Sequence, residues 1–85
     1  MPSPNRKIER VQTGVRIEKR ILKVLKALAA HHEMSLGDLI EGIVLHSFEG
    51  KAPFGAESLS FIEAMRSAYK LDLTAADSHR LTETS

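Results

Sequence analysis

Residues 10–17 alternate in character with a period of two. β-Branched side chains share one face of this segment: Val11, Thr13, Val15 and Ile17. The other face holds Arg10, Gln12, Gly14 and Arg16. Alternation of this kind, with β-branched residues on the inward face, is typical of a half-buried β-strand. The preceding residues 1–9 are polar and include two prolines, so they are expected to form a flexible basic arm.

The hydrophobic period then changes to that of an α-helix, and a helix is expected over about 18–32. Its apolar stripe consists of Ile21, Leu22, Val24, Leu25, Leu28 and Ala29. Its opposite side is basic and holds Lys19, Arg20, Lys23 and Lys26. Glu18 falls in the first turn, where a negative charge suits the positive end of the helix dipole.

Ser35 has the properties of an N-cap for a second helix, which Gly50 and Pro53 would end. The apolar stripe of this second helix comprises Leu36, Leu39, Ile40, Ile43, Val44 and Phe48. It is wide enough to pack against two partners. A linker and a third helix at about 57–70 fill residues 51–73. Residues 74–85 form a polar tail that is expected to fray.

A single strand requires a partner, because its backbone N–H and C=O groups are otherwise left unpaired. The chain contains no second segment of comparable quality and no cysteine for a disulfide. A short chain without disulfides usually needs a partner chain to stabilise its fold. The expected fold is therefore mainly α with one strand, an obligate intertwined homodimer that pairs its strands in an antiparallel ribbon. The expected dimer core is Val11, Thr13, Val15, Ile17, Leu25, Leu28, Leu39, Ile40, Ile43 and Val44.

The charge is divided unevenly along the 85 residues, although the net charge is only +1. Residues 1–26 contain eight basic and two acidic residues, for a net charge of +6. Residues 27–85 contain four basic and nine acidic residues, for a net charge of −5. A basic cluster of this kind indicates a surface for a polyanion such as nucleic acid.

The outward face of the expected ribbon has suitable chemistry for reading double-stranded DNA. The major groove admits a two-stranded ribbon, in which arginine can recognise guanine and glutamine can recognise adenine. Arg10, Gln12, Gly14 and Arg16 are accordingly the candidate base-contacting residues. Lys7, Lys19, Arg20 and Lys23 are candidate phosphate contacts, which fix register and carry little sequence information.

The segments VRIEKRILKVLKALA and MSLGDLIEGIV resemble the ribbon-helix-helix DNA-binding proteins of the Arc/MetJ/CopG superfamily. The resemblance covers residues 10–50 and implies an intertwined homodimer whose ribbon residues Gln12, Gly14 and Arg16 contact bases. We expect a transcriptional repressor or regulator, with several dimers on repeated or palindromic sites, because one ribbon reads few base pairs. It also implies that Ser35, Leu36 and Gly37 donate backbone N–H groups to a DNA phosphate, as a helix N-terminus can. Gly14 replaces the middle one of three usual base-reading side chains. The resemblance also implies a left-handed turn at Glu33, a position that commonly holds Gly or Asn in the family.

Other functions remain open at this stage. Residues 57–73 could cover the dimer's own core, or they could bind a toxin, as in the antitoxins of the same superfamily. A helical protein-interaction module without DNA binding is a third possibility. No metal site or cofactor is expected from His31, His32, His46 and His79, whose spacing is unsuitable. We expect a cytoplasmic protein that is not membrane-bound, because no apolar run is long enough to span a bilayer. We expect no enzymatic activity, because the sequence offers no phosphate-binding loop and no nucleophile with a paired base.

Overall fold

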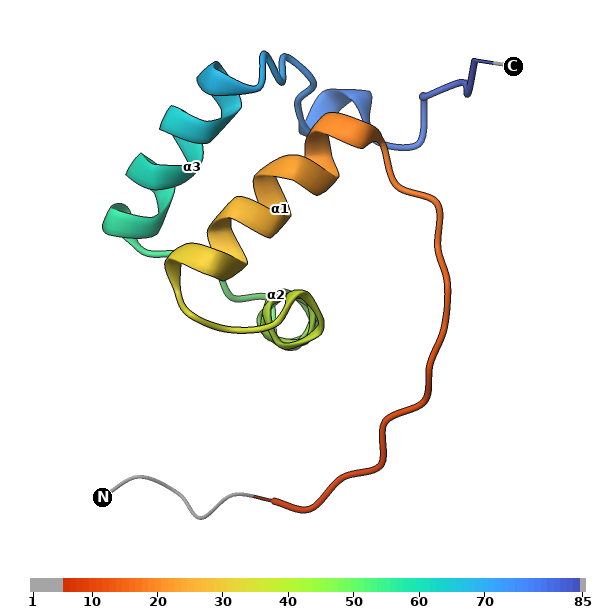
Figure 1. Cartoon of the computed structure of the whole chain (residues 1–85), viewed down its shortest axis with the longest axis vertical. Helices are drawn as coiled ribbons and strands as arrows, with labels where there is room; N and C mark the ends of the chain where they lie inside the picture. Colours follow the sequence, from red (N-terminus) through yellow and green to blue (C-terminus); the bar gives the residue numbers. More distant parts are fainter. Residues whose placement is uncertain (1–5, 85) are drawn as a thin grey trace.

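The computed structural model describes residues 6–84, which form three α-helices and one short 3-10 helix (Figure 1). Helix α1 spans Lys19–His31, α2 spans Leu36–Phe48 and α3 spans Ala56–Ala68. The 3-10 helix η1 spans Ala75–Asp77. The three α-helices lie close to the predicted ranges, because each predicted range follows an amphipathic stripe. None of these helices is long and apolar enough to cross a bilayer.

The predicted strand at residues 10–17 is wrong, and with it the ribbon-helix-helix fold class. Residues 6–84 contain no β-strand, so no ribbon is formed. The basic segment 6–18 instead leaves the start of α1 as an extended chain that passes α2 (Figure 1). A strand exists only when a neighbouring strand takes its backbone hydrogen bonds, and the regular elements of residues 6–84 are all helices. The alternating pattern thus produced an extended backbone without the sheet.

The extended segment also enlarges the molecule. The Cα radius of gyration is 14.5 Å, whereas a compact chain of this length has a value of about 12 Å. The apolar side chains of the segment are correspondingly exposed, by 79% for Val11 and 73% for Val15. Residues 10–17 therefore contribute little to the core of the chain.

The core lies where α1 packs against both α2 and α3. Leu28 is the most deeply buried side chain, with 1% of its surface exposed, and Ala29 and Leu39 surround it. Partly buried apolar side chains complete this cluster: Leu25, Ile43, Phe54, Phe61 and Ile62. The third helix thus packs against this cluster with Phe61 and Ile62 within the single chain.

Side-chain oxygens cap the first two helices. The carboxylate of Glu18 accepts hydrogen bonds from the backbone N–H groups of Arg20, at 2.9 Å, and Ile21, at 3.1 Å. Glu18 is therefore the N-cap of α1 and lies just before its first turn. The hydroxyl of Ser35 accepts from the N–H of Asp38 at 3.1 Å, which confirms the predicted cap of α2. Each cap satisfies N–H groups that have no partner within the helix.

All three α-helices end in the same way, in a Schellman motif. In each, the second residue after the C-cap donates its N–H to a carbonyl five residues earlier, from Met34 to Ala29 in α1. The residue before this donor adopts a left-handed backbone: Glu33 at φ 54°, Gly50 at φ 70° and Lys70 at φ 56°. Only the second motif uses glycine, which adopts this conformation without steric cost.

The C-terminal segment contains a compact turn where fraying was expected. Asp77 accepts a hydrogen bond from the N–H of Thr74 at 2.8 Å, and its own N–H donates to the Thr74 carbonyl at 2.9 Å. The N–H of Arg80 then donates to the Asp77 carbonyl at 3.0 Å. These bonds give residues 74–80 a defined path beside the start of α1 (Figure 1).

Replacing Glu33 with glycine should stabilise the chain by about 1 kcal/mol, because a left-handed conformation costs a non-glycine residue about 1–2 kcal/mol. The measurement is the free energy of unfolding in urea. Glu63→Gly is the matched control: it removes the same charge from the interior of α3, where glycine should destabilise by about 1 kcal/mol. Equal effects of the two substitutions would contradict strain at Glu33.

Candidate nucleic-acid interface

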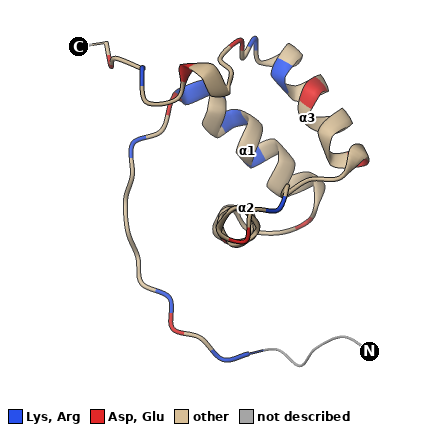
Figure 2. Cartoon of the chain, turned by 180° about the vertical axis from the view of Figure 1, so that it is seen from behind, with Lys and Arg blue, Asp and Glu red and all other residues tan. Residues whose placement is uncertain are grey.

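The basic residues of the N-terminal third lie on two connected surfaces. One is the extended segment 6–18, and the other is α1 (Figure 2). Lys7 and Lys19 are both exposed, the first on the extended segment and the second at the start of α1. On α3, by contrast, basic and acidic side chains occur together (Figure 2). The charge division along the sequence is not a full separation in space, because several of these basic residues contact carboxylates from later parts of the chain.

The four predicted base-contacting residues do not share one face. Gln12 and Gly14 lie exposed on the extended segment, and a Cβ added at Gly14 would meet nothing within 4 Å. Arg10 and Arg16, by contrast, each contact carboxylates of the same chain. Without a strand partner, no regular pleat orients these side chains in one direction.

Arg10 joins the extended segment to α2. Its Nε donates to Glu41 Oε2 at 2.9 Å, and its Nη2 donates to Glu41 Oε1 at 2.8 Å and to Asp38 Oδ1 at 3.0 Å. The hydrogen bond to Glu41 and the attraction between the two charges raise the pKa of Arg10. The hydrogen bond from Arg10 likewise lowers the pKa of Glu41. These hydrogen bonds from one guanidinium to two carboxylates hold the extended segment beside α2.

Arg16 and Arg20 contact the C-terminal part of the chain. Arg16 donates to the two carboxylate oxygens of Glu83 from Nε, at 2.9 Å, and from Nη2, at 2.6 Å. Arg20 donates from Nη1 to Asp72 Oδ1 at 3.1 Å and to the Lys70 carbonyl at 3.0 Å. Arg20 also bonds Glu18 at 3.1 Å through Nε. Both arginines therefore have carboxylate partners within the chain.

Lys23 and the start of α2 complete the set of predicted phosphate contacts. The Lys23 ammonium lies 5.7 Å from the centre of the Tyr69 ring, at cation–π distance. Ser35, Leu36 and Gly37 form the N-terminus of α2, as predicted. The carboxylate of Asp38 occupies the same turn, and its negative charge opposes the approach of a phosphate to these N–H groups.

The residues predicted for a dimer core divide into two groups. Leu28 and Leu39 are buried inside the single chain, and Leu25, Ile40 and Ile43 are partly buried. The remaining ones are exposed: Val11, Thr13, Val15, Ile17 and Val44. A groove of about 870 Å³ separates the extended segment from α2. Its lining includes Val11, Val15, Leu22, Leu36 and Ile40.

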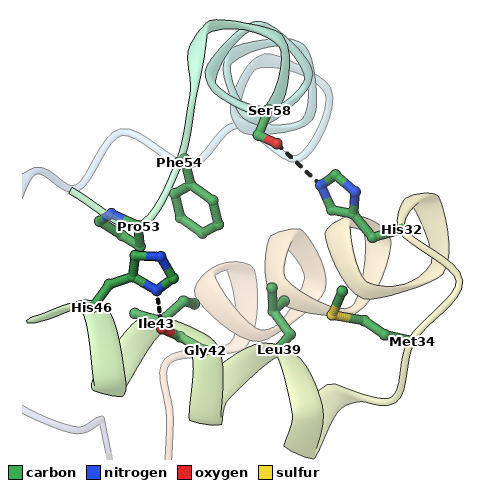
Figure 3. A pocket seen from close by; sticks show the side chains of 9 residues that line it. All are labelled: His32, Met34, Leu39, Gly42, Ile43, His46, Pro53, Phe54 and Ser58. Carbon is green, nitrogen blue, oxygen red and sulfur yellow. Dashed lines mark hydrogen bonds between the residues drawn. The ribbon is translucent and has the colours of Figure 1, made fainter. Parts of the chain in front are cut away.

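A smaller hollow of about 240 Å³ lies between the end of α1, α2 and the loop before α3 (Figure 3). His32 faces Ser58 across it, with 3.1 Å between Nε2 and Oγ, and His46 Nδ1 lies 2.7 Å from the Gly42 carbonyl. Apolar side chains form most of the remaining wall. Among residues 6–84, no group of three or more His, Cys, Asp or Glu side chains could hold a metal ion.

Comparisons with models of protein families, with curated proteins and with solved structures give no match for this chain. The candidate nucleic-acid interface is therefore described from the residues of this chain alone. Sequence reasoning found the basic positions but missed their acidic partners, Glu41, Asp72 and Glu83. The net negative charge of residues 27–85 was the one feature of the sequence that could have indicated these partners. It does not specify which carboxylate pairs with which arginine.

The Glu18 cap should make stability depend on pH. Partial burial favours the neutral acid, but hydrogen bonds from Ile21 and Arg20 outweigh this effect and lower the pKa of Glu18 below 4.5. A lowered folded-state pKa contributes stability above pH 4.5 that is lost as the pH falls through the folded value. Glu18→Ala should therefore lower the midpoint of thermal unfolding at pH 7, and the deficit should shrink below pH 4.

Circular dichroism melts at several pH values measure this effect, and Glu57→Ala is the control. Glu57 lies in the first turn of α3, where it does not cap the helix through its side chain. A deficit for Glu18→Ala that stays constant from pH 7 to pH 3 would contradict an ionised cap.

Proposed function

We propose that this protein binds double-stranded DNA as a homodimer, through the basic residues of the extended segment and α1, and regulates transcription. The observation that carries the proposal is the concentration of eight basic residues in the first 26 positions. Lys7, Arg16 and Lys19 are exposed in this part of the chain. Affinity of this type comes from neutralising phosphates and releasing their counterions.

Gln12 and Arg16 are the residues proposed to recognise base edges. Both side chains lie on an exposed extended backbone, which is narrow enough to approach the floor of a DNA groove. Arginine can donate two hydrogen bonds to guanine, and glutamine can pair with adenine. The missing side chain at Gly14 permits a closer approach of the backbone between them.

Self-association is proposed because the single chain buries few apolar side chains. Val24, Leu28, Ala29 and Leu39 are the buried hydrophobic residues within the described range. Val11 and Val15 remain exposed and line the groove between the extended segment and α2, and Val44 is exposed on α2. A second copy of the chain would cover these positions, and burial of apolar surface contributes about 25 cal/mol per Å². Two copies would also join two basic segments in one binding surface.

Replacing both Gln12 and Arg16 with alanine should weaken binding to a selected duplex by at least about tenfold, because each base-recognising side chain contributes about 1–3 kcal/mol. The preferred duplex is first selected from a random-sequence pool with the parent protein. Fluorescence anisotropy then measures the dissociation constant for the selected duplex and for a scrambled one. The preference for the selected sequence should fall in the double variant.

Lys51→Ala is the control for this experiment, since it removes a basic side chain that lies beyond α2 and pairs with Glu49. It should leave the sequence preference unchanged. If the parent protein bound no duplex with salt-dependent affinity, the proposed function would be overturned. Unchanged preference in the double variant would overturn the assignment of Gln12 and Arg16.

The proposed dimer predicts that Val15→Asp converts the protein to a monomer, because Val15 is exposed and lines the groove, and a charge there would be buried in the interface. Sedimentation equilibrium at micromolar concentrations measures the mass, and circular dichroism checks that the helices persist. Leu59→Asp is the control, because Leu59 is exposed on α3, away from the groove. A parent protein that sediments as a monomer would contradict the proposal.

A further inference from the structure

Two arginines of the proposed DNA-binding surface are engaged by one C-terminal segment, residues 71–84. Glu83 holds Arg16 through two hydrogen bonds of 2.9 and 2.6 Å. Asp72 contacts Arg20 at 3.1 Å. These contacts bridge 67 and 52 positions of sequence, so they depend on how the chain is folded. The segment therefore lies across the junction between the extended segment and α1.

This C-terminal segment has a defined route between its two carboxylates. Leu71 follows the left-handed residue that ends α3, and it lines a hollow together with Ile21 and Leu25 of α1. The turn at Ala75–Asp77 then redirects the chain, with Asp77 occupied by its own bonds to Thr74. The segment thus packs against α1 at Leu71 and turns at Ala75–Asp77, and this path places Glu83 beside Arg16.

The carboxylates of this segment bind the arginines in the way that groups of a nucleic acid would. A guanidinium donates two parallel N–H groups to a carboxylate in the same geometry in which it binds phosphate or guanine. The donors that Arg16 directs at Glu83 are therefore donors that DNA would need. Residues 71–84 contain three acidic residues and one basic residue, so their net charge also repels a polyanion.

We propose that residues 71–84 act as an autoinhibitory strap, which occupies Arg16 and Arg20 with carboxylates and must be displaced when DNA binds. This inference rests on the proposed DNA binding. The side chains of Arg16 and Glu83 are 84% and 66% exposed, and exposed ion pairs are weak. The strap therefore lowers affinity without abolishing it. A modification or partner that removes the strap would increase DNA binding without any change in the helices.

The test compares the parent with Asp72→Asn/Glu83→Gln, in which amides replace both carboxylates at nearly constant size. Fluorescence anisotropy with a random-sequence duplex at low salt should show binding about 3- to 10-fold tighter in the variant. The gain should shrink as salt increases, because exposed ion pairs are screened. Glu83→Gln made in an Arg16→Ala background should give a clearly smaller gain, since the partner of Glu83 is then absent and only its charge is removed.

Glu57→Gln/Glu63→Gln is the matched control, because it removes two negative charges from α3. Neither residue makes an ion pair in the part of the chain that the structure describes. An equal gain in the control would attribute the effect to net charge and overturn the strap. Parent and strap variant with equal affinity would overturn it as well. Failure of all variants to bind any duplex would instead overturn the proposed function together with this inference.

Discussion

The burial of Leu28 between three helices is the interaction on which the rest of the structure depends. Helix α1 is the only element that packs against both α2 and α3 within the described residues, and Leu28 lies at this junction. The extended segment leaves from one end of α1, and a Schellman turn at the other end directs the chain into α2. A core this small contributes limited free energy, so the helix ends and caps matter more than in a larger domain.

Electrostatics then organises the surface around this core. The basic residues of the extended segment and α1 meet carboxylates from α2 and from the C-terminal segment, as for Arg10 with Glu41 and Arg16 with Glu83. All of these pairs are at least partly exposed, and such pairs contribute little to stability. Their importance lies in position, because they determine which donors are directed to solvent and which are already occupied.

Hydrophobic periodicity predicted the helices well, because amphipathic stripes and local caps are properties of neighbouring residues. Ser35 was expected to cap α2 and does so, and Gly50 was expected to end it and has the left-handed backbone. The strand was predicted from equally regular alternation and is absent from residues 6–84. A helix satisfies its hydrogen bonds within one segment, whereas a strand depends on a second segment that no local pattern supplies.

The sequence by itself determined where the helices begin and end, and it determined that positive charge is concentrated in the first 26 residues. The tertiary structure alone decided which side chain of each stripe is buried and which carboxylate meets which arginine. Contacts such as Arg16 with Glu83 join residues 67 positions apart. Their formation depends on the packing angles and turns that bring distant segments together, and a linear pattern of residues contains no measure of those distances.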